Sequence, residues 1–173
     1  MELWDLYDKN RTPLGKTIVR GQPVPAGCFF TAVSIWVVNN KGEILLTLRA
    51  PEKKSWANYW ENSGGAVQAG ETSLQAAVRE LREETGICAH PEELRFIGTD
   101  RWPEGFMDVF LCSKTVPIEQ IALQPTETAD AKWVNLEQFH EMCRQGLVAQ
   151  PIIERFEHFS ADLLDFINTC KQS

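Results

Sequence analysis

The sequence predicts an α/β fold in which a mixed β-sheet packs between helical layers. Runs rich in β-branched and aromatic residues alternate along the chain with segments that carry apolar residues at helical spacing. One of the predicted helices has capping residues at both ends. The 173 residues are 43% hydrophobic and 24% charged, a composition that favours a single globular domain spanning 1–173.

The elements follow from local patterns. Residues 1–27 form an N-terminal extension with a short extended or hairpin segment. Residues 28–38 and 43–49 are predicted to pair as a β-hairpin, because Asn39-Asn40-Lys41-Gly42 supplies turn residues between them. A loop with several aromatic residues is expected over 53–62. Further strands are expected over 94–98, 107–114 and 131–134, and helices over 136–145 and 151–169, the last within a C-terminal helical segment at 146–173.

The most clearly marked element is the helix from Thr72 to Thr85. Thr72 and Gln75 form a capping-box pattern at its start, and Gly86 stands where a helix C-terminus favours glycine. At about 100° per residue, Glu80, Glu83 and Glu84 lie side by side next to an apolar stripe. Like charges at this spacing repel one another, so a cation is expected between them.

The net charge limits the partners of the protein. A formal charge of -7 and a pI near 5.0 argue against binding to nucleic acid or to an anionic membrane surface. The five scattered cysteines and the lack of a leader or spanning segment favour reduced thiols and a cytoplasmic protein. If the substrate is an anion, a metal must offset the repulsion, and oxygen ligands suit Mg²⁺ or Mn²⁺.

The string GAVQAGETSLQAAVRELREETGI, residues 65–87, matches every fixed position of the signature G-x5-E-x7-R-E-U-x-E-E-x-G-U, in which U is aliphatic. In this it resembles the Nudix hydrolase superfamily, and the likeness extends over about 29–145. The resemblance implies a Nudix-type α/β/α sandwich and a pyrophosphohydrolase that cleaves a small organic diphosphate, such as a nucleoside-diphosphate-like molecule.

The resemblance also implies roles for residues of this box. Glu80, Glu83 and Glu84 would bind the metal, with the Gly65 carbonyl as a further ligand. Glu80, Glu83 and Arg79 are the expected catalytic residues, and Arg79 would also pair with Glu71 to support the box. The general base varies within the family, which leaves Glu83 or a later carboxylate open. The later candidates are Glu104, Asp108 and Glu127.

The expected substrate-binding residues are Arg49, Lys53, Trp60 and Gly64. Basic groups at the sheet edge would complement a diphosphate, and aromatic rings in loops would stack on a base or cover an apolar chain. Besides Trp60, the rings considered are Trp56, Tyr59, Trp102 and Phe106.

Two other functions stay open. The extended N-terminus and the Trp60-x-Asn62-Ser63 segment resemble the isopentenyl diphosphate isomerase branch of the superfamily. That isomerase has a Cys and a His where this chain has residues 64–67, Gly-Gly-Ala-Val, so hydrolysis is favoured. A non-catalytic Nudix-fold nucleotide sensor is the second alternative, although this chain keeps every carboxylate of the box. A homodimer is left open, and specificity beyond the diphosphate depends on loops.

Overall fold

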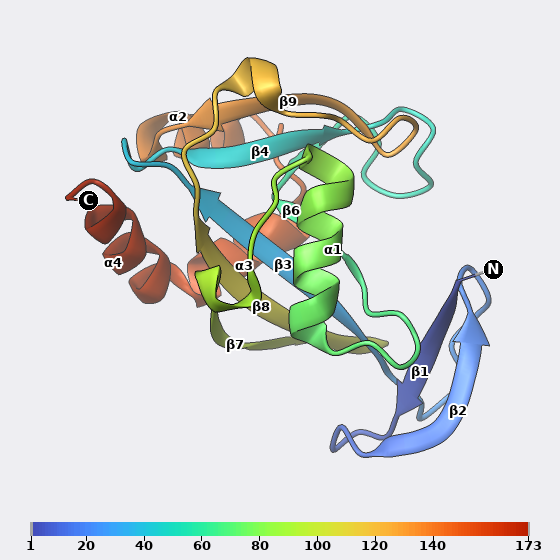
Figure 1. Ribbon diagram of the computed structural model, residues 1–173. Coiled ribbons are helices and arrows are strands. Elements are labelled where there is room, and N and C mark those ends of the chain that lie inside the picture. Colours follow the sequence, from blue (N-terminus) through green and yellow to red (C-terminus); the bar gives the residue numbers. More distant parts are fainter. Residues whose placement is uncertain (1, 173) are drawn as a thin grey trace.

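The computed structural model describes residues 2–172, in which helices cover both faces of a mixed sheet (Figure 1). No helix in this range is both long and apolar enough to span a membrane. The strands are β1 (Leu3–Tyr7), β2 (Pro13–Val19), β3 (Phe30–Val38), β4 (Ile44–Arg49), β5 (Trp60–Glu61), β6 (Ser63–Ala66), β7 (Leu94–Trp102), β8 (Gly105–Ser113) and β9 (Thr128–Val134). The helices are α1 (Ser73–Thr85), α2 (Leu136–Arg144), α3 (Gln150–His158), α4 (Ser160–Cys170) and the short 3₁₀ turns η1 (Pro91–Glu93) and η2 (Ile118–Gln120).

The main sheet has the strand order β5-β4-β3-β8-β7, with β6 also paired to β3 and β9 also paired to β4. The long β3–β8 pair is parallel, whereas the other pairs in the sheet are antiparallel. This confirms the predicted mixed sheet. The N-terminal segment forms a separate two-stranded hairpin, β1-β2, which extends from the body of the molecule (Figure 1).

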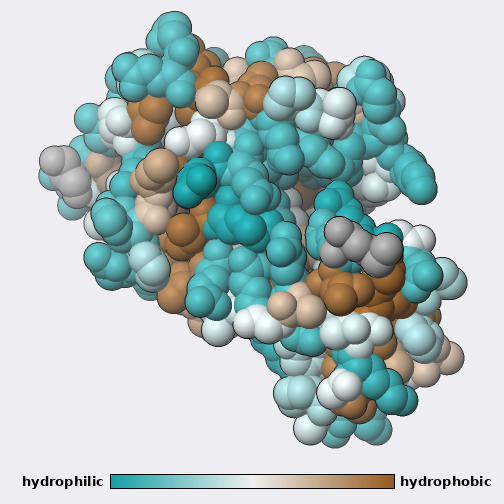
Figure 2. Space-filling model, turned by 45° about the vertical axis from the view of Figure 1, so that its right-hand side comes forward, coloured by the Kyte–Doolittle hydropathy of each residue, from teal (hydrophilic) through white to brown (hydrophobic). Residues whose placement is uncertain are grey.

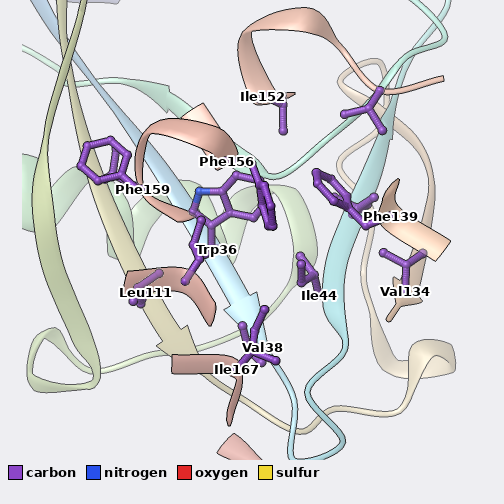
Figure 3. Close-up of a cluster of buried hydrophobic side chains, with 14 of the residues drawn as sticks. Trp36, Val38, Ile44, Leu111, Val134, Phe139, Ile152, Phe156, Phe159 and Ile167 are labelled. Atoms are coloured by element: carbon purple, nitrogen blue, oxygen red, sulfur yellow. The ribbon is translucent and has the colours of Figure 1, made fainter. Parts of the chain in front are cut away.

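The pleat of the central strand separates two apolar cores. Val33, Ile35 and Val37 of β3 pack with α1, whereas Trp36 and Val38 point to the opposite face. On that face Trp36 contacts Phe139 of α2 and Phe156 of α3 through edge-on ring contacts (Figure 3). Because α1 covers one face and α2, α3 and α4 cover the other, the predicted α/β/α sandwich is confirmed.

The predicted hairpin of β3 and β4 is correct only at its turn. The two strands pair at Val38 and Ile44 and then diverge. The first half of β3 pairs instead with β6, through residues 32–35 and 63–66, and β4 pairs with β9. Residues 63–66 therefore form a strand that the sequence pattern did not indicate, because two adjacent glycines suggest a loop.

The predicted helix over 151–169 is wrong as a single element. It divides at Phe159, whose φ of -105° and ψ of 21° interrupt the helical backbone. The ring of Phe159 occupies the space above Gly98 of β7, where an added Cβ would lie 2.6 Å from it. The sequence pattern does not indicate this break, because apolar residues keep a helical spacing across it. The break depends instead on how the helices pack against the twisted sheet.

The N-terminal hairpin is anchored to the sheet by a buried ion pair. Arg11 donates two hydrogen bonds to the carboxylate of Asp108 in β8, at 2.8 and 2.5 Å, and Thr99 donates a third at 2.7 Å. Burial raises the pKa of Asp108, but the hydrogen bonds from Arg11 and Thr99 lower it more, so the net pKa falls below its usual 3.8. The ionised carboxylate is thus the form that holds the hairpin in place.

Replacing Arg11 with Gln is expected to lower the free energy of unfolding by about 1–3 kcal/mol near neutral pH, because the buried Asp108 loses its charge partner. The 35% exposure of the Arg11 side chain keeps this value below that of a fully buried pair. Asp108 has a lowered folded pKa, so its contribution is present above the unfolded pKa and is lost as the pH falls through the folded one.

The loss in R11Q should therefore shrink as the pH falls below the usual aspartate value. Urea unfolding across a pH series measures this difference. The matched control is K16Q, which changes an exposed cation on β2 of the same hairpin. An equal loss in R11Q at every pH would contradict the assigned ion pair.

Candidate active site

Helix α1 begins and ends where the sequence predicted. The hydroxyl of Thr72 accepts a hydrogen bond from the backbone N–H of Gln75, and the Gln75 side chain completes the capping box. Gly86 closes the helix in the left-handed region at φ 74°. The apolar side of the helix, including Ala77 and Leu81, is buried against the sheet. This fixes the rotation of α1 and turns its row of glutamates toward β6.

The glutamates of α1 line a hollow of about 310 Å³, which we call the acidic hollow. It opens between the N-terminal hairpin and the body of the molecule, and hydrophilic side chains gather around it (Figure 2). Its lining comes from all parts of the chain except the C-terminal helices: Glu2, Trp4, Arg20, Phe30, Ala32, Arg49, Lys53, Gly64, Gly65, Ala66, Gln68, Arg79, Glu80, Glu83, Glu84, Trp102, Gln124 and Glu127.

The three box carboxylates differ in burial. Glu84 is 8% exposed and accepts a hydrogen bond of 3.1 Å from the backbone N–H of Gly64. Burial and the nearby charges of Glu61 and Glu80 raise the pKa of Glu84 well above its usual value. Burial also raises the pKa of Glu80. The Glu83 side chain is 44% exposed, so it is the carboxylate most accessible to water.

The two glycines of β6 allow this close packing. A Cβ on Gly65 would lie 2.3 Å from the Glu80 carboxylate, and one on Gly64 would lie 2.3 Å from the backbone oxygen of Val33. Both distances are shorter than atomic contact permits. Gly64 is therefore required, because the backbone of β6 lies too close to that of β3 for a Cβ, whereas a Cβ on Gly65 would force the end of the Glu80 side chain to move.

Arg79 connects the parts of the box. Its guanidinium donates to both oxygens of Glu71 at 2.9 and 3.0 Å, to the Ala66 carbonyl at 3.0 Å, to Glu80 at 2.8 Å and to Glu83 at 3.1 Å. Burial lowers the pKa of Arg79, but the hydrogen bonds with Glu71 and Glu80 raise it more, for a net rise. Arg79 thus holds the loop, the strand and the helix of the box in one arrangement.

The residues of the hollow fit a hard divalent cation. Two buried carboxylates with raised pKa values and a third, accessible one lie along one edge of α1, beside the backbone of β6. In the conformations described for residues 2–172, no three acidic, histidine or cysteine side chains converge tightly enough to hold an ion. Arg79 instead holds Glu80 and Glu83, so a cation would have to displace its hydrogen bond to Glu83.

Each cation that lines the acidic hollow is paired with a glutamate. Arg49 donates to Glu61 at 2.6 Å, Lys53 pairs with Glu127, and Arg20 donates to Glu2 at 2.8 Å. The first pair joins β4 to β5, the second joins the loop after β4 to the loop before β9, and the third belongs to the N-terminal hairpin. A phosphate entering the hollow would therefore meet donors that are already positioned by carboxylates.

The hairpin supplies the wall opposite α1. The rings of Trp4 and Phe30 stack with centroids 4.4 Å apart, and Phe30 meets Trp102 edge-on at 5.2 Å. The backbone of the box loop is tied to the same hairpin, because Gly70 donates to the Asp5 carboxylate at 2.7 Å and Ala69 donates to the Leu3 carbonyl at 2.8 Å. Sequence reasoning missed the hairpin residues Glu2, Trp4 and Arg20, since no local pattern links them to the box.

The structure brings most of the residues singled out from the sequence into this hollow. Arg49, Lys53, Gly64, Gly65, Arg79, Glu80, Glu83, Glu84 and Glu127 all line it. Trp60 does not: its ring packs on the core beneath the ammonium of Lys132, 4.0 Å away. Trp102 and Phe106 lie in strands rather than loops.

The two remaining carboxylates proposed as bases lie outside the hollow. Asp108 is held by Arg11, and Glu104 occupies the turn between β7 and β8. Of the three later carboxylates, only Glu127 lines the hollow, where it pairs with Lys53.

The model of the NUDIX domain matches residues 29–156. The chain belongs to the Nudix family. It is 36% identical over 147 residues to an uncharacterized Nudix hydrolase of Listeria monocytogenes, covering 84% of this chain and 87% of the relative. It is also 35% identical over 113 residues to an isopentenyl-diphosphate Delta-isomerase of Escherichia coli, covering 61% of each. The predicted resemblance to the superfamily and to its isomerase branch is confirmed.

Solved structures confirm the Nudix fold. DR0079 from Deinococcus radiodurans superposes with a TM-score of 0.70 at 22% identity, covering 98% of this chain and 99% of that one. A bifunctional NMN adenylyltransferase/ADP ribose pyrophosphatase from Francisella tularensis, in complex with AMP and a Mn ion, gives a TM-score of 0.66 at 21% identity, covering 83% of this chain and 44% of that one. At these identities the likeness concerns the fold alone.

Replacing Glu84 with Gln is expected to stabilise the metal-free Nudix protein by roughly 1–2 kcal/mol near neutral pH, because it removes a buried charge close to Glu61 and Glu80. The amide oxygen of Gln can still accept the Gly64 hydrogen bond. Urea unfolding in a chelating buffer measures this change. The matched control, E83Q, alters an exposed carboxylate and should change stability by less than about 0.5 kcal/mol. A destabilised E84Q would contradict the assigned charge repulsion.

Proposed function

We propose that this Nudix hydrolase is a magnesium-dependent pyrophosphohydrolase that cleaves the diphosphate linkage of a small organic diphosphate. The observation that carries the proposal is the set of three box carboxylates along one edge of the acidic hollow, facing cations on its other sides. Membership in the family and the named hydrolase relative support the reaction class. An acidic protein needs such a site to bind an anionic substrate.

Each residue would then have a defined task. Glu80, Glu83 and Glu84, with the Gly65 carbonyl, would hold Mg²⁺ or Mn²⁺, which when bound neutralises phosphate charge and favours ionisation of the attacking water. Arg49 and Lys53 would orient phosphate oxygens by charge-assisted hydrogen bonds. Glu83 would accept the proton of the water, because it is the most accessible of the three carboxylates. Arg79 would keep Glu80 and the box loop in position.

The isomerase alternative requires a proton donor and acceptor beside an allylic carbon. The residues that line the acidic hollow include neither a cysteine nor a histidine, and Gly64 and Gly65 occupy the segment where the isomerase has such groups. The hydrolytic reaction is therefore the one that the side chains of the hollow support. A sensor without turnover would bind a diphosphate and leave it intact.

One panel assay separates these three functions. Hydrolysis and isomer formation are measured with ADP-ribose, isopentenyl diphosphate and nucleotide sugars, with Mg²⁺ present or chelated. The hydrolysis products are two organic monophosphates from ADP-ribose or a nucleotide sugar, and an organic monophosphate with inorganic phosphate from isopentenyl diphosphate. We expect metal-dependent hydrolysis of at least one compound and no isomer. Isomer formation from isopentenyl diphosphate would support the rival enzyme, and tight binding without turnover of any compound would support the sensor.

Replacing Glu83 with Gln is expected to reduce the rate of hydrolysis by about 100-fold or more, because the variant loses both a proton acceptor and a metal ligand. Since the side chain is 44% exposed, the thermal unfolding midpoint should hardly change. The matched control is E92Q, an exposed glutamate in η1 outside the hollow. Full activity of E83Q would contradict the assignment of Glu83 as proton acceptor and metal ligand.

A further inference from the structure

A second cavity, of about 210 Å³, adjoins the acidic hollow between the sheet and α3. We call it the side cavity. It shares Ala32, Arg49, Gly64 and Gly65 with the acidic hollow, so one ligand can occupy both spaces. Its other walls are mainly apolar and come from β3, β8, the loop after β4, the segment of β5 and β6, and α3 with the residue before it: Val33, Ser34, Trp56, Glu61, Asn62, Ser63, Met107, Ala149, Pro151, Ile152 and Arg155.

Arg155 is the unusual member of this lining. It is only 7% exposed, yet it makes a single hydrogen bond among the described residues, a long one of 3.4 Å from Nη1 to the hydroxyl of Ser34. Its Nε is buried and has no hydrogen-bond partner, and the nearest carboxylate, that of Asp100, lies 4.0 Å from it. A guanidinium carries five N–H donors, so most of the Arg155 donors make no hydrogen bond to the described residues.

The position of Arg155 is fixed by its surroundings. The Ser34 hydroxyl that accepts from Arg155 also accepts a hydrogen bond of 2.7 Å from the Asn62 side chain. Neighbouring Ile152 and Phe156 of α3 are buried in the core against Trp36. The guanidinium is therefore held at the wall of the side cavity by packing, and folding the chain around it leaves a buried charge with little compensation.

The charges that line the side cavity do not cancel. Arg49 and Glu61 form a close pair, whereas the ion pair of Arg155 with Asp100 is long, at 4.0 Å, and Asp100 is not part of the lining, so the charge of Arg155 is only partly balanced. Burial lowers the pKa of Arg155, which reflects the cost of keeping this cation away from water. An anionic oxygen in the cavity would restore both the charge balance and the missing hydrogen bonds.

We propose that the side cavity is the specificity subsite of this enzyme and that Arg155 binds an anionic oxygen group, a carboxylate or a phosphate, at the far end of a compact organic diphosphate. This inference rests on the proposed binding of the diphosphate in the acidic hollow. The volume of about 210 Å³ limits the part of the ligand that enters the side cavity to a small group. The substrate is thus a small molecule that carries an anionic group at each end.

Three diphosphates that differ at the far end test this assignment. Isopentenyl diphosphate ends in a hydrocarbon, mevalonate 5-diphosphate ends in a carboxylate, and 5-phosphoribosyl 1-diphosphate ends in a phosphate. Their dissociation constants are measured by calorimetry with Mg²⁺ in the E83Q background, which limits turnover. The lost metal ligand weakens binding of the diphosphate in all three compounds alike, so the comparison between them still reports on the far end. We expect at least one anionic compound to bind about 10- to 100-fold more tightly than isopentenyl diphosphate. The stronger of the two identifies the end group.

Replacing Arg155 with Met should remove this preference and leave the affinity for isopentenyl diphosphate unchanged. That unchanged affinity, with a retained thermal midpoint, shows that R155M is folded. R155K keeps the cation and should recover part of the preference. D100N is the matched control, and it should keep the preference for an anionic compound. If the only role of Arg155 were to pair with Asp100, D100N would abolish the preference as R155M does, and the proposal would be overturned.

Three further outcomes are decisive. Equal binding of all three compounds by the protein that retains Arg155 would overturn the subsite. A second outcome is that binding depends on Arg155 but the protein with Glu83 intact releases no phosphate from any compound. That outcome would contradict the proposed hydrolysis and support the subsite. Turnover of an anionic compound that R155M does not alter would sink the subsite alone.

Discussion

The arrangement of this molecule depends on the close packing of two glutamates against a strand of glycines. Glu84 and Glu80 are drawn out of water beside Gly64 and Gly65, where burial and mutual repulsion disfavour their ionised forms. A side chain on Gly64 would prevent the approach of β6 to β3, and one on Gly65 would displace the Glu80 carboxylate. The sheet accommodates this by letting β6 replace β4 as the partner of the first half of β3. Gathering these carboxylates at one edge of the hollow therefore lowers the stability of the folded protein.

The rest of the hollow is assembled from segments far apart in the chain. The N-terminal hairpin closes one side, and its position depends on Arg11 and Asp108, which are 97 residues apart. The cations of the hollow are each held by a glutamate from a different segment. Binding a diphosphate would therefore redistribute an existing network of ion pairs rather than fill a set of free donors, and this gives the site a means of rejecting anions that fit poorly.

The two cavities divide the recognition of a substrate between them. The acidic hollow is polar and carries the chemistry, whereas the side cavity is mainly apolar with a single buried guanidinium on its wall. Residues of α3 support the side cavity from the face of the sheet opposite α1. Because the two faces are covered by different helices, the residues that α3 contributes to the side cavity can vary without touching the carboxylates of α1.

The sequence by itself determined the fold class, the limits of α1 and the row of glutamates on it, because capping and helical spacing are local properties of the chain. Only the tertiary structure decided that residues 63–66 form a strand, that the C-terminal helix divides at Phe159, and that Trp60 turns to the core. The same holds for Glu2, Arg20 and Arg155, which reach the two cavities through contacts between distant segments. Such contacts depend on how the sheet twists and which strands pair, and neither property can be predicted from a short stretch of sequence.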